Sequence, residues 1–326
     1  MINQNNSNSN SQFSATQKSP SNTPLFLHST LTLTSNDFTS SNTYNYDFQL
    51  FNKYFYFHLD YLRVSTTDLT EKSFILLTTI LFSKVDSKII NKPWHPDPSM
   101  PKRKKYKNRR VSKTGIVIGW TKRAKYRGRN TRYVYDVMID FTGAYFADLT
   151  LLEQQELIYY LNSNWKLKCH RIDVAIDDYS RQLFPVGQII SAFLEGNQYG
   201  FKVIDDSYLD IINNKLVGTL GLGSRRSSFF VRIYTKHQEF VRWETELKQN
   251  KAQKLFDKLI ELNVDKSEGS LPVLDILKSL LDAALCKIDF RDKSIGVSLK
   301  NATKTRTNRL PFWQILLDNL YSIIEN

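Results

Sequence analysis

The chain has 326 residues, 41% of them hydrophobic, and a formal net charge of +13 at pH 7. Its size allows one large core or two moderate ones and excludes a disulfide-stapled miniprotein, while the positive charge favours a polyanionic partner, nucleic acid before membrane. No apolar run approaches the roughly 20 residues that a transmembrane helix needs, so no membrane partner is expected.

The cysteines and histidines are spaced too widely for most metal or disulfide chemistry. Cys169 and Cys286 lie far apart, and the five histidines form no HxH, HExxH or HxxxH pair. This spacing argues against a disulfide framework and against a zinc site. We therefore expect a reducing compartment, the cytoplasm or the interior of an organelle, and not secretion.

The N-terminal segment has the composition of a tail. Residues 1–24 are rich in Asn, Ser and Gln and have few large apolar side chains, so burial cannot repay the entropy of ordering them. We predict a disordered tail over residues 1–49 and a folded domain over residues 50–326. Within that domain, partial alternation predicts a strand over residues 53–66, and residues 70–82 are typical of a helix.

A strongly basic segment follows the first helix. Residues 92–110 combine prolines with a dense run of Lys and Arg. Like charges repel and proline removes backbone donors, so we predict a flexible basic loop over residues 92–113. The loop is a solvated segment, a localisation signal or a phosphate contact. Its candidate nucleic-acid-binding residues are Lys102, Arg103, Lys104, Lys105, Lys107, Arg109 and Arg110.

The rest of the chain alternates between strand and helix patterns. A basic hairpin is predicted from strands at 114–120 and 132–141 with the turn RGRN between them. Further strands are expected at 166–178, 229–234 and 241–247. Apolar residues at helical spacing predict helices over 151–163, 185–194, 252–262, 271–284 and 311–324.

One predicted strand has two carboxylates on a single face. In KLKCHRIDVAIDDYS, alternation buries Ile172, Val174 and Ile176 and leaves Asp173 and Asp177 on the other face. On that face only the small Ala175 lies between the two carboxylates. In a strongly basic protein, this arrangement indicates either a functional acidic site or a salt-bridged strand edge.

A tyrosine lies among charges in the stretch VGTLGLGSRRSSFFVRIYTKHQEFVRWETELK, residues 217–248. Side chains two apart share a strand face, so Tyr234 has Arg232 and Lys236 on its own face. The next strand presents Arg242, Glu244 and Glu246 in the same way. Cations stabilise phosphate and phenolate, and carboxylates hold a divalent ion, so this pattern is a candidate phosphoryl-transfer centre.

The order of these segments resembles a known family. RIDVAIDDY, GLGSRRSSFFVRIYTKHQE, RWETELK, IDFRDKS and FWQILL follow one another as in the replication initiation factor family. That family contains rolling-circle plasmid initiators of the staphylococcal type, related phage initiators and conjugative-element relaxases. The resemblance spans about residues 53 to 320.

The resemblance implies an activity and a site. Members of this family nick one strand of a replication origin with a tyrosine, stay attached to the 5′ phosphate and leave a 3′ hydroxyl. It implies Tyr234 as nucleophile with Arg232 and Lys236, and origin DNA, single-stranded or extruded as a cruciform, as substrate. Oxygen ligands select Mg²⁺ or Mn²⁺; the candidate ligands are Asp173, Glu244, Asp177 and Glu246, and further DNA contacts are Arg225 and Arg226.

The expected fold is α+β, an antiparallel RRM-like sheet flanked by helices, in which two related halves could meet near residue 165. A host helicase is an expected partner, and a homodimer is left open. Two other readings also stay open. One is a conjugative relaxase with the same chemistry, and the other is a non-enzymatic DNA- or RNA-binding protein in which Tyr234 is an ordinary sheet aromatic.

Overall fold

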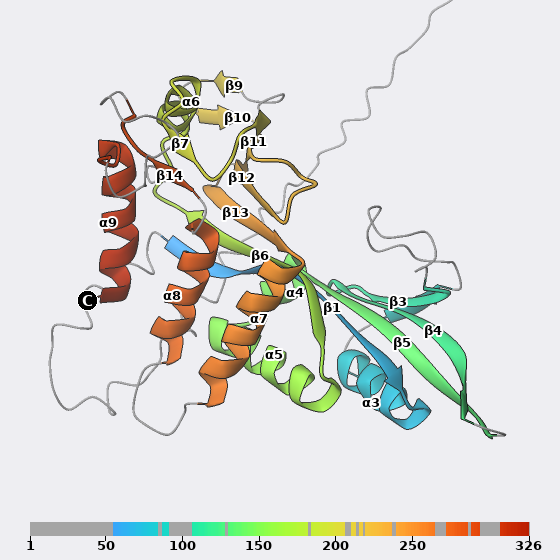
Figure 1. The fold of residues 1–326 in the computed structure, drawn as a ribbon. Coiled ribbons are helices and arrows are strands. Elements are labelled where there is room, and N and C mark those ends of the chain that lie inside the picture. Colours follow the sequence, from blue (N-terminus) through green and yellow to red (C-terminus); the bar gives the residue numbers. More distant parts are fainter. Residues whose placement is uncertain are drawn as a thin grey trace, which may run out of the picture.

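A computed structural model gives the arrangement of most of the chain (Figure 1). It describes residues 55–83, 87–90, 106–127, 130–181, 184–205, 210–212, 215–217, 219–236, 239–264, 272–285, 288–293 and 307–325. The predicted tail, residues 1–49, lies outside these ranges. So do residues 91–105, which include Lys102, Arg103, Lys104 and Lys105 of the basic segment.

One antiparallel sheet of ten strands organises the described residues. In spatial order its strands are β2 (Ser87–Ile90), β3 (Asn108–Ser112), β4 (Ile116–Arg127), β5 (Asn130–Thr142), β1 (Phe55–Leu69), β6 (Lys168–Asp178), β13 (Phe240–Lys248), β12 (Phe229–Lys236), β11 (Thr219–Leu222) and β8 (Ile204–Asp205). Two small ladders join β10 (Lys215–Val217) to β9 (Asp210–Ile212) and β14 (Asp289–Phe290) to β7 (Gln198–Tyr199).

Seven helices accompany the sheet in the described part of the chain. They are α3 (Glu71–Phe82), α4 (Gly143–Phe146), α5 (Leu151–Trp165), α6 (Val186–Leu194), α7 (Asn250–Val264), α8 (Pro272–Leu285) and α9 (Pro311–Glu325). In Figure 1, α3, α5, α7 and α8 lie along the same side of the sheet. No helix in the described ranges is long and apolar enough to cross a membrane.

Strand alternation explains why the helices gather on one face. Ile172, Val174 and Ile176 of β6 are fully buried, as the sequence predicts. Trp243 of β13 is buried beside them and packs against Trp313 of α9, with the two rings tilted by 35°. Burying such side chains is the main favourable term in folding. The alternate residues of the same strands, apart from Ala175, are mostly polar and point to the opposite face, which the four helices named above leave open.

Helix α5 supports the central strand β1 from the helix side. Thr150 and Glu153 form a capping box at its first turn, which satisfies two backbone donors. The side chain of Gln154 is completely buried; its Oε1 accepts from Leu59 N at 3.0 Å, and its Nε2 donates to the carbonyls of Phe146 and Leu149. Leu59 precedes a bulge in β1, so Gln154 stabilises the backbone where the register shifts.

The predicted elements are confirmed in type and order, with one correction. The basic segment 92–113 is not all loop, because Asn108–Ser112 forms β3 and pairs with β2 and β4. The adjacent Arg109 and Arg110 hide the alternation in sequence. In the sheet their side chains take opposite faces, so the two charges do not crowd one another. The α+β class and the antiparallel sheet are as predicted.

Replacing Gln154 with Met should keep the shape of the side chain and remove its three hydrogen bonds. Buried backbone groups left without partners cost about 1–3 kcal/mol each, so we expect the unfolding free energy to fall by about 2–4 kcal/mol in urea titrations. The exposed Gln188→Met is the control and should stay within about 0.5 kcal/mol of wild type. Equal stability of Gln154→Met and wild type would contradict this role.

Candidate active site

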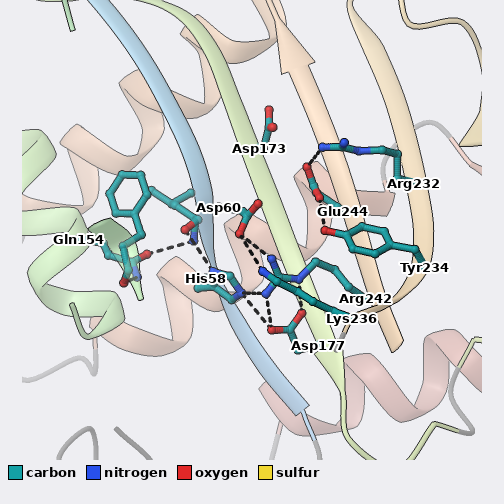
Figure 2. Close-up of polar contacts among 12 residues, drawn as sticks. His58, Asp60, Gln154, Asp173, Asp177, Arg232, Tyr234, Lys236, Arg242 and Glu244 are labelled. Atoms are coloured by element: carbon teal, nitrogen blue, oxygen red, sulfur yellow. Dashed lines mark hydrogen bonds and ion pairs between the residues drawn. The ribbon is translucent and has the colours of Figure 1, made fainter. Parts of the chain in front are cut away.

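The open face of the sheet gathers the charged residues of four adjacent strands. Tyr234 pairs with Arg242 of β13, which pairs in turn with Asp177 of β6. One row further along, Arg232 lies opposite Glu244, and beyond that Glu246 lies opposite Asp173. The two segments singled out in the sequence are therefore side by side in space (Figure 2).

Tyr234 is held by a carboxylate. Its Oη donates to Glu244 Oε2 at 2.8 Å, and Arg232 Nη2 donates to the other oxygen of the same carboxylate. Glu244 is only 1% exposed. Burial, and next the negative charge of Glu244, raise the pKa of Tyr234 well above that of a free phenol. In this arrangement the tyrosine is a neutral hydrogen-bond donor.

The two cations on the strand of Tyr234, Arg232 and Lys236, differ in how they are bound by neighbouring carboxylates. Arg232 Nε is buried and has no hydrogen-bond partner, although the guanidinium binds Glu244. Lys236 has Asp60 Oδ1 at 4.0 Å, and burial, followed by the charge of Arg242, lowers the pKa of Lys236. An unpartnered buried donor is costly, so a phosphate oxygen at Arg232 would satisfy a group that the protein leaves unmatched.

Arg242 is the centre of a buried ion-pair network. Its Nε and Nη2 donate to the two oxygens of Asp177 at 2.5 and 2.7 Å, and its Nη1 donates to Asp60 Oδ1 at 2.5 Å. His58 Nε2 lies 3.1 Å from Arg242 Nη2 and 3.2 Å from Asp177 Oδ2. Burial alone would raise the pKa of Asp177, but His58 and Arg242 outweigh it and lower the pKa below the usual value.

His58 and Asp60 come from β1 and were not among the predicted site residues. Leu59 and Tyr61 pair with Val174 and Asp173, so Asp60 is the extra residue of a bulge, and its side chain turns toward Arg242. Gly143, at the start of α4, makes room for it, since a Cβ there would lie 2.4 Å from Asp60 Oδ1. The signal in sequence is the polar pair inside YFHLDYL, which becomes informative once β1 is known to lie beside β6.

A second tyrosine on this face has a similar setting. Tyr61 Oη donates to Asp140 Oδ2 at 2.5 Å and accepts from Arg63 Nη2 at 2.5 Å, and the Arg171 guanidinium lies 4.6 Å from its ring centre. Burial, followed by the charge of Asp140, raises the pKa of Tyr61. Tyr61 is thus the tyrosine against which an assignment of Tyr234 has to be tested.

The carboxylates Asp173, Glu244 and Glu246 form an acidic cluster. Arg171 binds Asp173 at 2.8 and 2.5 Å and Glu246 at 3.2 Å, and Lys248 binds Glu246 at 2.5 Å. Asp173 is fully buried. Burial raises its pKa to about 7 even against the hydrogen bond from Arg171, and the charges of Glu244 and Glu246 add to the shift.

The donor chemistry of this cluster fits a hard divalent cation. Three carboxylates that repel one another are stabilised by Mg²⁺ or Mn²⁺. Among the described residues, however, no group of three or more His, Cys, Asp or Glu side chains is arranged to hold a metal ion, because each carboxylate is turned toward a cation. Asp177 is held at both oxygens by Arg242 and also contacts His58, so three side-chain interactions engage it.

The predicted DNA-contacting residues are divided between two places. Arg225 lies in the turn before β12, with its guanidinium 5.4 Å from the ring centre of Phe230, and the exposed Arg226 follows it. Lys107, Arg109 and Arg110 lie at β3, separated from β12 by five strands. Arg110 stacks on Phe82 of α3 at 4.5 Å, so it faces the helix side and not the side of Tyr234.

The fold has a counterpart among solved structures. A broad antiparallel sheet with helices along one face is the arrangement that the two proteins share. The solved structure of the rolling circle replication initiator protein from Geobacillus stearothermophilus is similar to this chain with a TM-score of 0.53 and 17% sequence identity. The match covers 83% of this chain and 97% of that chain. No family model and no curated protein matches the sequence.

The raised pKa of Asp173 predicts how the stability of the metal-free protein depends on pH. Between about pH 4 and pH 7 the folded state binds a proton that the unfolded state has lost, so this carboxyl's contribution to stability falls as pH rises, and it is constant above pH 7. Asp173→Asn should remove the dependence. In urea titrations with EDTA, the stability of wild type minus that of Asp173→Asn should fall by up to about 1.4 kcal/mol per pH unit. A difference that does not change with pH would contradict the assignment.

Proposed function

We propose that this chain initiates rolling-circle replication by nicking one strand of origin DNA through Tyr234. The observation that carries the proposal is the sheet face itself. Tyr234 is hydrogen-bonded to the buried Glu244, has Arg232 and Lys236 on its own strand face, and lies close to an acidic cluster. The fold shared with a solved initiator supports the same reading.

The proposed reaction exchanges one phosphoester bond for another. The Tyr234 Oη attacks the scissile phosphorus, an O–P bond to tyrosine forms, and the P–O3′ bond breaks. The products are a 5′-phosphotyrosyl end and a strand with a free 3′ hydroxyl. Because the bond energy is kept in the phosphotyrosine, resealing by the reverse attack needs no nucleotide cofactor.

The protons can be assigned to residues in contact. Glu244 Oε2 already accepts the hydrogen bond from Tyr234 Oη, so it is placed to take the phenolic proton. Lys236 has a lowered pKa and lies two residues from Tyr234 on the same face of β12, so it is suited to protonate the leaving 3′ oxygen. Arg232 Nε is free to bind a non-bridging phosphate oxygen, where negative charge develops.

The acidic cluster gives the role for a metal. Asp173 and Glu244, with Glu246 beside them, would hold Mg²⁺ or Mn²⁺. A bound divalent ion would polarise the phosphate and offset the charge of Glu244, which otherwise raises the pKa of Tyr234. For this, Arg171 and Arg232 must turn away from Asp173 and Glu244.

Several partners follow from the reaction. The substrate is origin DNA presented as a single strand or as a cruciform, because Tyr234 must reach one phosphate of an unpaired strand. Extension from the 3′ hydroxyl requires a polymerase and strand separation, which a host helicase would supply. Such a protein works where its replicon is found, in the cytoplasm or the interior of an organelle.

Replacing Tyr234 with Phe removes one oxygen and keeps the ring. We expect DNA binding to persist and nicking to disappear when supercoiled DNA of the same replicon is incubated with Mg²⁺ or Mn²⁺ and resolved on a denaturing gel. Wild type should give relaxed circles with covalently attached protein. Peptide mapping should place the adduct within residues 232–236.

Tyr61→Phe is the matched control for the nucleophile. It removes the same oxygen from a second tyrosine of this sheet face, which is hydrogen-bonded to a carboxylate and an arginine, and it should retain nicking and the adduct. An adduct that maps to Tyr61, or a Tyr234→Phe protein that still nicks, would overturn the assignment of Tyr234.

The role of the carboxylates as metal ligands can be tested separately from their role in nicking. Asp173→Ala and Glu244→Ala should each weaken Mn²⁺ binding by more than about tenfold in isothermal titration, since loss even of an outer-sphere partner costs that much. Both should also abolish nicking, and EDTA should abolish nicking by wild type. The exposed Glu261→Ala removes one carboxylate from α7 and should change neither property. Unchanged Mn²⁺ affinity in both cluster variants would exclude this site.

A further inference from the structure

We propose that the outer end of the β4–β5 hairpin is an arm that grips duplex DNA beside the nick site. The arm comprises residues 122–127 of β4 and 130–135 of β5. None of its residues belongs to the active site. In Figure 1 the hairpin runs out past α3 at the end of the sheet, away from the other helices.

The arm is the part of the hairpin with the densest positive charge. Residues 122–132, KRAKYRGRNTR, contain six Lys or Arg residues and no Asp or Glu. Burial of apolar surface does not explain this density of charge. Charges of one sign on a two-stranded ribbon also repel one another. Lys125 and Arg132 are directly opposite across the ladder, and like charges in that position destabilise a sheet. A bound polyanion would relieve this repulsion.

Strand alternation puts three of these cations on the face of Tyr234. Asp140 of β5 contacts Arg63 on the open face. The β4–β5 pairing continues without a bulge from Ile116–Phe141 to Arg127–Asn130, so Arg132 shares the face of Asp140. Its partner Lys125, and Arg123 two residues before, share it as well. DNA that crosses the open face from Tyr234 therefore meets these side chains.

The cations are available to a ligand. Arg123 pairs with Asp68 and, at 2.7 Å, with Asp136, while Lys125 pairs with Asp68. The side chains of Arg123 and Lys125 are 39% and 41% exposed, and those of Asp68 and Asp136 are 38% and 29% exposed. Ion pairs as exposed as these contribute little, so phosphate can replace the carboxylate at small cost. Arg132 is exposed as well. On the other face of the arm, Tyr126 and Tyr133 are 75% and 58% exposed, the highest values among the described tyrosines.

The shape of the arm favours duplex over single-stranded DNA. A two-stranded β-ribbon fits the major groove of B-form DNA and meets phosphates along both walls. Single-strand binding relies on a platform of stacked aromatic rings, but the aromatic rings of the arm lie on the face opposite to Arg123, Lys125 and Arg132. The arm therefore has the features of a phosphate-gripping ribbon.

The position of the arm sets its distance from the nick. Four strand spacings to Arg132 on β5, or five to Lys125 on β4, and about fourteen residues of strand separate this pair from Tyr234, which gives up to roughly 50 Å. At about 3.4 Å per base pair, this corresponds to roughly 12 to 15 base pairs. The arm would thus hold the duplex between about one and one and a half helical turns from the unpaired strand at Tyr234.

The inference deepens the proposed function, because it names the DNA structure that flanks the nick site, but its test needs no cleavage. Wild type and Lys125→Ala/Arg132→Ala are titrated in EDTA against a fluorescent 40-base-pair duplex of mixed sequence and against a 12-nucleotide oligo(dT), at several salt concentrations. The matched control is Lys254→Ala/Lys258→Ala, which removes two exposed charges from α7 on the helix side.

For the duplex, the arm variant should bind on the order of tenfold more weakly, and its slope of log K against log salt should be smaller by about 1.8, the value for two lost phosphate contacts. Its affinity for oligo(dT) should stay within about twofold of wild type, and the α7 control should match wild type on both probes. An unchanged duplex slope would overturn the proposal, and so would an equal loss on oligo(dT) and duplex. Failure of Tyr234 to nick would leave this result untouched.

Discussion

The buried guanidinium of Arg242 is the interaction on which the open face depends. Taking this cation and Asp177 out of water costs several kcal/mol for each ion, and only good geometry repays it. Arg242 meets that condition, because Nε, Nη1 and Nη2 all have acceptors on β6 and β1. The network ties β13 to two further strands, so β12, which carries Tyr234, is paired with a strand whose position is fixed.

Charge balance explains why so many ionised groups can be buried on one sheet face. Each carboxylate there has at least one cation: Arg171 for Asp173, Arg232 for Glu244, Arg242 for Asp177 and Lys248 for Glu246. The sequence motif RxDxAxDD next to RxExE expresses this pairing, since alternate positions supply both signs to the same face. The balance is local and leaves the net charge of +13 to the rest of the molecule, including the β4–β5 arm.

Most of the fold and half of the site could be predicted from the sequence. Period-two patterns located β6, β12 and β13 and the face on which Asp173, Tyr234 and Glu244 lie, because side-chain direction in a strand is fixed by local geometry. The position of β1 between β5 and β6 is a long-range pairing with no local signature, and Asp60 reaches Arg242 only because of a bulge. The sequence predicts a loop where β3 lies, because the adjacent Arg109 and Arg110 hide the two-residue alternation that is typical of a strand.

The contact between Tyr234 and Glu244 has opposite effects on reactivity. Glu244 orients the phenol and can accept its proton, but its negative charge, together with burial, raises the pKa of Tyr234 and keeps the phenol protonated in the free protein. In the proposed function, only cations brought to Glu244 and to the scissile phosphate reverse this effect. In that proposal Tyr234 would be inactive until DNA and a divalent ion were both in place, and this would restrict cleavage to the assembled origin complex.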